Sequence, residues 1–180
     1  MQFNKSLITA ALLAVGSLAA VSANAAEVSD KFEVKIKIKS VCTVNAKVGA
    51  NDVNFGEVVG GTAATASAAT PLTVSCSKNT PYIVNLTPSN NNKLGLGGMK
   101  GPNAVEGTTL IPYQLRKAAG ESAAIWGNEG TLVAAGNGIA GTGQGTTTPI
   151  THTVYATTTA SATDVTPGSY VDTVTVSVTY

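Results

Sequence analysis

Apolar and polar residues alternate along much of the chain with the period of two that β-strands produce. The clearest example, residues 31–39, would place four apolar side chains on one face: Phe32, Val34, Ile36 and Ile38. The last segment alternates in the same way and would place on one face Val174, Val176, Val178 and Tyr180. Shorter alternations predict strands over 71–77, 82–87, 110–115 and 150–156. The pattern is that of an all-β protein with almost no helical periodicity.

Turn residues separate these segments, as in an antiparallel β-sandwich. Residues 88–92, Pro-Ser-Asn-Asn-Asn, and the pair Pro167-Gly168 have turn chemistry. We also expect a short strand with a glycine bend over 52–58 and another over 132–134. An immunoglobulin-like sandwich would normally continue with a strand after 170–180, and none follows in this sequence. We therefore predict an incomplete immunoglobulin-like sandwich that lacks its last strand and has an open edge there.

The first residues have the features of an export signal. Lys5 is followed by an apolar stretch over 7–20 and by Ala23-Asn24-Ala25, a small-residue cleavage motif. The apolar stretch is shorter than the roughly 20 residues that span a bilayer. We expect residues 1–25 to be a signal peptide, residues 26–40 an N-terminal extension and residues 41–180 one β-sandwich domain.

The charge balance argues against a nucleic-acid binder. The formal net charge is +1, and without Lys5 ten basic side chains face ten acidic ones. Nucleic-acid binding normally requires a basic excess with interleaved aromatic residues, whereas this chain has a single arginine, Arg116. The lysines of 31–39 would line the exposed face of a strand, where they discourage indiscriminate edge pairing.

The two cysteines predict one structural disulfide. In an exported chain Cys42 and Cys76 would meet an oxidising compartment. The sequence contains no Cys-x-x-Cys pair and only one histidine, so neither a metal site nor a redox site is expected.

Residues suited to catalysis do not form a recognisable motif. His152 lies within a predicted strand, and no nucleophile elbow or carboxylate pair accompanies it. Residues 136–141 match the G-x-G-x-x-G pattern, but they continue into more loop sequence instead of the helix that a dinucleotide site needs. We expect no enzyme activity, no catalytic residues, no metal and no cofactor.

Several short motifs together resemble the spore coat protein U-like domain family. They are the strand before Cys42, Tyr-Gln-Leu at 113–115, Trp-Gly-Asn at 126–128, His-Thr-Val-Tyr at 152–155 and the segment 167–176. Within that group the chain is most similar to the major pilin subunits of Csu-type archaic chaperone-usher pili. The resemblance implies a Gram-negative bacterium, export through the periplasm with a dedicated chaperone, passage through an outer-membrane usher, and assembly into a surface pilus used in attachment and biofilm formation. Other pilus subunits, including a tip adhesin, would be further partners.

The two alternating segments suggest how such a fibre would form. The face comprising Phe32, Val34, Ile36 and Ile38 would act as a donor strand that completes the sandwich of a neighbouring, identical subunit. It would lie beside the open edge of the last strand, whose inward face is Val174, Val176, Val178 and Tyr180.

A monomeric secreted binding module is the alternative. Glycine-rich loops would then present Trp126 or Tyr113 to a glycan or peptide, and residues 32–38 would belong to the sheet of their own chain. The oligomeric state of the mature protein distinguishes the two interpretations.

Overall fold

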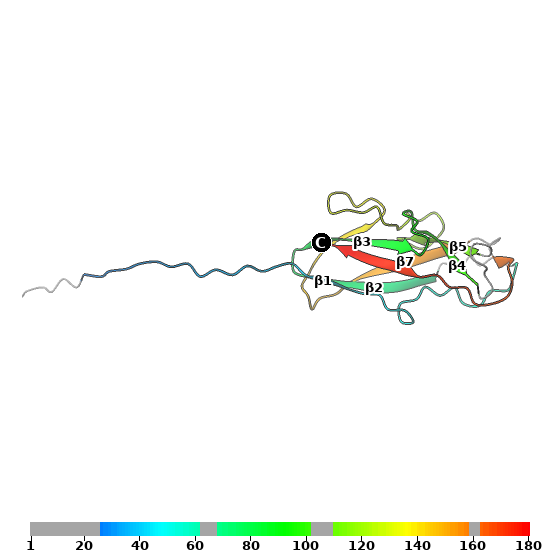
Figure 1. Ribbon diagram of the computed structural model, residues 1–180, viewed down its shortest axis with the longest axis horizontal. Coiled ribbons are helices and arrows are strands. Elements are labelled where there is room, and N and C mark those ends of the chain that lie inside the picture. Colours follow the sequence, from blue (N-terminus) through cyan, green and yellow to red (C-terminus); the bar gives the residue numbers. More distant parts are fainter. Residues whose placement is uncertain (1–25, 62–67, 102–109, 159–162) are drawn as a thin grey trace, which may run out of the picture. The chain divides into compact units, whose positions relative to one another are not determined.

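The computed structural model describes residues 26–61, 68–101, 110–158 and 163–180. The predicted signal peptide lies outside these residues. Within these residues the chain forms eight strands: β1 (Cys42–Asn45), β2 (Ala68–Cys76), β3 (Pro81–Pro88), β4 (Leu96–Lys100), β5 (Leu110–Arg116), β6 (Ile139–Thr142), β7 (Ile150–Thr158) and β8 (Val174–Thr179) (Figure 1). No α-helix occurs in the described part, and therefore none that is long and apolar enough to cross a membrane. The all-β prediction is confirmed.

The strands form two antiparallel sheets. One has five strands in the order β1-β2-β7-β5-β4, and the other has three in the order β6-β3-β8. Their inward side chains pack together as in an immunoglobulin-like sandwich, because alternate residues on each strand face the core. The buried core draws on both sheets and includes Leu72, Val74, Val84, Leu86, Leu115, Trp126 and Val154.

The cysteines join two neighbouring strands. Cys42 and Cys76 are paired residues at matching ends of β1 and β2, and their sulfur atoms form a disulfide. The predicted bridge is therefore present. It fixes the start of the sandwich at the point where the N-terminal segment ends.

Three expected strands are absent from the described residues, and two strands, β4 and β6, were not expected. The structure assigns no strand to residues 26–41 or to residues 52–58. Residues 131–134 form a bend instead of a strand, and the Thr131 amide donates to the Ala134 carbonyl across it. In contrast, β4 and β6 lie in glycine-containing stretches where side chains give little alternation.

The chain divides into two units, one ending at Lys37 and the other running from Ile38 to Tyr180. In the first unit, residues 26–37 have no regular secondary structure. All eight strands belong to the second unit.

Candidate strand-binding groove

The last strand pairs on one side only. β8 forms an antiparallel ladder with β3, from Val174 opposite Pro88 to Thr179 opposite Ile83. No other strand of the described residues pairs with its second edge. The backbone groups along that edge are therefore available to a further strand.

The inward face of β8 is incompletely covered. Val174, Val176 and Val178 pack against the buried core but are only partly buried, while the intervening side chains are exposed. This alternation places the three valines on one face of the strand. Tyr180 follows the end of β8 and is 49% exposed.

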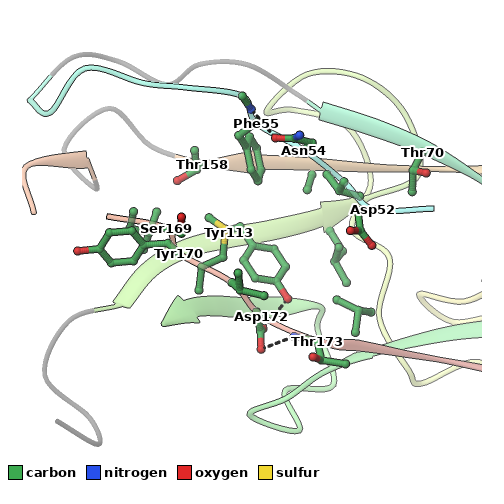
Figure 2. A pocket seen from close by; sticks show the side chains of 18 of the residues that line it. Asp52, Asn54, Phe55, Thr70, Tyr113, Thr158, Ser169, Tyr170, Asp172 and Thr173 are labelled. Carbon is green, nitrogen blue, oxygen red and sulfur yellow. Dashed lines mark hydrogen bonds between the residues drawn. The ribbon is translucent and has the colours of Figure 1, made fainter. Parts of the chain in front are cut away.

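A groove of about 850 Å³ opens over the core beside this strand. Val174 and Val176 form part of one wall, and residues 51–58 form part of the opposite wall. Figure 2 shows Phe55 on one side of the cavity, Asp172 and Thr173 on the other, and Tyr113 between them. The floor is mainly apolar and contains Leu72, Leu86, Tyr113, Leu115, Val154 and Ala156. Such a surface favours an apolar occupant over water.

The wall opposite β8 is an irregular segment held by local hydrogen bonds. The Asn51 side-chain amide donates to the Pro71 carbonyl at 2.6 Å, and the Gly56 amide donates to the Asn54 side chain at 2.7 Å. Gly56 has a φ of 73°, which other residues rarely adopt. Val53 and Phe55 nevertheless pack against the core. This segment therefore supplies apolar lining without pairing as a strand.

A hydrogen-bonded polar pair, Tyr113 and Asp172, lies among the lining residues. The Tyr113 hydroxyl donates to Asp172 Oδ2 at 2.6 Å, and the Thr173 amide donates to Asp172 Oδ1 at 2.8 Å. Burial, followed by the hydrogen bond to Asp172 and the charge of that residue, raises the pKa of Tyr113. The phenol therefore keeps its proton at physiological pH and remains a donor to the carboxylate.

The segment carrying Asp172 is anchored to both sheets. Val171 and Lys100 exchange two backbone hydrogen bonds, of 2.8 and 3.0 Å, at the edge of β4. Three residues later the chain enters β8 in the other sheet. This crossing fixes the position of Asp172 at the beginning of the inward face of β8.

Family comparison agrees with this architecture. Residues 28–177 match the Spore Coat Protein U domain family. The chain belongs to this family. The match covers the alternating N-terminal segment as well as the sandwich.

A solved structure has a similar fold to this spore coat protein U domain. It is a chain in the crystal structure of the CsuC-CsuE chaperone-tip adhesion subunit pre-assembly complex from archaic chaperone-usher Csu pili of Acinetobacter baumannii. The two chains are 22% identical with a TM-score of 0.50, and the similarity covers 79% of this chain and 40% of that one. This chain thus spans less than half of the length of its structural neighbour. No curated protein matches it.

The N-terminal part of the spore coat protein U domain carries exposed apolar side chains. Phe32, Val34, Ile36 and Ile38 are 82–88% exposed, so none contributes to the core of the single chain. Lys35 forms an ion pair with Glu33, and both side chains are largely exposed. Four large apolar residues in alternation, all open to solvent, are typical of a segment that becomes covered by a partner.

His152 is partly buried in this domain and lies against two aromatic residues of the core. Its Nε2 atom lies 2.9 Å from the Tyr82 hydroxyl, and its ring contacts those of Tyr82 and Trp126 edge to face. Burial lowers the pKa of His152, which favours the neutral imidazole. Among the described residues, no group of three or more potential ligands is arranged to hold a metal ion. These contacts fit a structural histidine that orients two aromatic rings.

The aromatic residues named for the binding-module alternative are not displayed by the loops of the domain. Trp126 is fully buried and donates from Nε1 to the Val84 carbonyl at 3.0 Å. Tyr113 is 5% exposed and lies on the floor of the groove. Trp126 thus packs its loop against the core of the sandwich. The sequence indicated the edge valines, but it did not indicate the groove floor, the wall at 51–58 or the Tyr113–Asp172 pair.

Proposed function

We propose that the chain is a structural subunit of an archaic chaperone-usher pilus, which polymerises head-to-tail by donor-strand complementation. The donor strand is the face formed by Phe32, Val34, Ile36 and Ile38. The acceptor is the groove beside β8, with its edge at Val174, Val176, Val178 and Tyr180. The resulting surface fibre serves attachment and biofilm formation.

The open edge of β8 over an uncovered part of the core carries this proposal. An edge of this kind accepts an extended segment through backbone hydrogen bonds, while alternate side chains enter the groove, as is established for chaperone–pilin complexes. The exposed N-terminal residues have the required alternation. Donor and acceptor thus complement each other in periodicity and in apolar character.

The expected energy is large enough to govern assembly. Burying one large apolar side chain contributes about 1.5 to 3 kcal/mol, so four contribute roughly 6 to 12 kcal/mol before costs. Ordering the extension and losing rigid-body freedom oppose this by several kcal/mol. The remainder stabilises the contact between subunits, and slow extraction of the strand adds to the durability of the fibre.

The donor strand and the acceptor groove are different surfaces of one subunit. Contacts of this type join subunits head to tail and produce an open filament unless the geometry closes into a ring. The disulfide at Cys42 lies four residues beyond Ile38 and tethers the donor at its root. The short tether hinders insertion of the strand into its own groove.

An uncovered groove needs protection before assembly, because exposed core promotes aggregation. We assign this role to a periplasmic chaperone, and we assign passage to the cell surface to an outer-membrane usher. The complex that contains the similar solved fold pairs a chaperone with a tip adhesion subunit. In the fibre, identical subunits would be the main partners and a tip adhesin would be the terminal one.

The test compares two neighbouring substitutions in the donor segment. Ile36→Asp places a carboxylate on the apolar face, whereas Lys37→Asp places the same group on the opposite face. We expect Ile36→Asp to be exported but to form no surface fibres by electron microscopy, and Lys37→Asp to form them. Abundant fibres from Ile36→Asp would contradict the proposal, and stable soluble monomers of the unmodified mature chain would favour the binding module.

A further inference from the structure

Asp172 lies at one end of the row of apolar side chains along the acceptor edge. It precedes β8 by two residues and therefore shares the inward phase of the valines. The structure confirms this phase, because Asp172 lines the groove and accepts the hydrogen bond from Tyr113. The inward row along the groove thus begins with a carboxylate and continues with four apolar side chains: Val174, Val176, Val178 and Tyr180.

The donor segment also has a bounded apolar row. Asp30 and Ser40 share the phase of the four apolar residues between them, and both are exposed. One end of the donor row therefore carries a negative charge, and the other carries a neutral hydroxyl. The two ends would meet different neighbours depending on the direction in which the strand inserts.

We propose, on the basis of the function proposed above, that Asp172, held in place by Tyr113, determines the direction and register of the inserted strand. If the four apolar pairs align antiparallel to β8, Ser40 lies beside Asp172. If they align parallel to β8, Asp30 lies beside Asp172. In the antiparallel arrangement the apolar pairs are Ile38 with Val174, Ile36 with Val176, Val34 with Val178 and Phe32 with Tyr180.

Charge distinguishes the two directions. Two carboxylates brought together in a partly buried groove repel each other, and the lower effective dielectric constant there strengthens the repulsion. A serine hydroxyl can instead donate a hydrogen bond to a carboxylate oxygen. Tyr113 and Thr173 each use one acceptor position on Asp172, which leaves further positions for Ser40. The antiparallel direction is therefore favoured.

The same carboxylate opposes a shift in register. In an antiparallel register shifted by two residues, Ile38 would lie beside Asp172 in place of Ser40. The alkyl side chain would remove water from the carboxylate without replacing its hydrogen bonds, which is unfavourable. A shift of two residues in the other direction would place Ser40 beside Val174, so that Asp172 loses the serine donor. Asp172 therefore favours a single register.

Cysteine cross-linking measures the register of the inserted donor strand directly. Thr173 is exposed and precedes β8 in the phase opposite to the valines, and Lys31, Lys37 and Lys39 are exposed and alternate with the apolar residues of the donor segment. Thr173→Cys is combined in turn with one of three cysteines in the donor segment. A link to Lys39→Cys reports the antiparallel register, and a link to Lys37→Cys reports that register shifted by two residues. A link to Lys31→Cys reports the parallel direction. After assembly and mild oxidation, we expect a covalent ladder of subunits only with Lys39→Cys.

Removing the charge of Asp172 should relax this selection. Asp172→Asn keeps an acceptor for the Tyr113 hydroxyl but removes the charge. This abolishes the repulsion of Asp30 and lowers the cost of covering the side chain with Ile38, so ladders through Lys31→Cys and Lys37→Cys should appear. If either of these links forms in chains that retain Asp172, or if Asp172→Asn leaves the pattern unchanged, the inference is wrong although fibre formation stands. If the unmodified chain forms no fibres at all, the proposed function itself fails.

A second test does not depend on the cysteines. Ser40→Asp should reduce the extent of assembly about tenfold or more, because it places a carboxylate beside Asp172. Asp172→Asn in the same chain should restore assembly, and Asp30→Asn should leave it unchanged as a control. Failure of the rescue, or faster assembly of Asp30→Asn, would overturn the antiparallel assignment.

Discussion

Gly97 and Tyr113 are paired residues on β4 and β5, and the Tyr113 ring occupies the space that a side chain at position 97 would need. A Cβ atom at Gly97 would collide with the phenol end of the ring. Close approach of this kind requires glycine. The position of the Tyr113 hydroxyl, and with it the bond to Asp172, therefore depends on a residue in a neighbouring strand.

Gly97→Ala should destabilise the domain by about 1 to 3 kcal/mol, the usual cost of overpacking. Displacement of the ring should also weaken the Tyr113–Asp172 hydrogen bond. Gly98→Ala is the control, because its nearest neighbours are side-chain atoms of Leu110 at 3.3 Å and beyond, which can move slightly. Urea unfolding of both variants measures the difference. Equal midpoints would show that the ring at position 113 is not held as described.

Acid should destabilise the domain through His152. Burial lowers the pKa of His152 in the folded state below its ordinary value of 6.5. The unfolded chain therefore binds the proton first, and the contribution of His152 to stability is present above about pH 6.5 and declines as the pH falls toward the lower folded pKa. The decline should not exceed about 1.4 kcal/mol per pH unit for this one group.

The measurement is urea unfolding between pH 7.5 and pH 4.5 for the wild-type chain and for His152→Gln. The variant removes the titrating group but retains a polar side chain near the Tyr82 hydroxyl. We expect a smaller loss of stability in the variant over this range. Identical pH profiles would mean that His152 does not contribute to acid sensitivity.

Replacing both cysteines should lower stability without changing the fold. Cys42 and Cys76 are 34 residues apart in sequence, and restricting an unfolded loop of this size contributes roughly 3 to 4 kcal/mol in the chain-entropy description. The double variant Cys42→Ser, Cys76→Ser should therefore unfold at lower urea concentration than the oxidised wild-type chain. Reduced wild-type protein provides the control. A double variant as stable as the oxidised protein would exclude a stabilising role for the bridge.

The sequence predicted the strands whose side chains alternate clearly. The segments around Leu72, Val84, Leu115, Val154 and Val176 lie in β2, β3, β5, β7 and β8. In β5 and β8 burial alternates along the strand, so the periodicity that identifies the strand is also the one that stabilises it, whereas β3 buries residues 82–86 without a break. For these segments local pattern and tertiary packing agree.

The same reasoning failed where glycine or distant pairing decides the structure. β4 contains Gly97 and Gly98, and β6 contains Gly141, so their strand character comes from pairing with β5 and β3. Residues 52–58 alternate in sequence, yet the positive φ of Gly56 interrupts extended backbone. A local pattern cannot reveal either outcome.

The polar pair in the groove was equally invisible in the sequence. Tyr113 and Asp172 are 59 residues apart, and no local sequence motif indicates that they are in contact. In the sequence, Asp172 lies two residues before Val174 and so has the phase of the valines in β8. It could not predict that a tyrosine from the other sheet would meet this carboxylate inside the groove.

The central claim is that the free edge of β8 receives a strand from the next subunit. Hydrogen exchange over residues 170–180 tests it most directly, by comparing wild-type fibres with the soluble Ile36→Asp chain. Amides on the unpaired edge of β8 should exchange rapidly in the soluble variant and become strongly protected in the fibre. Protection of the whole of β8 in the soluble chain, or no gain in protection on fibre formation, would contradict the account.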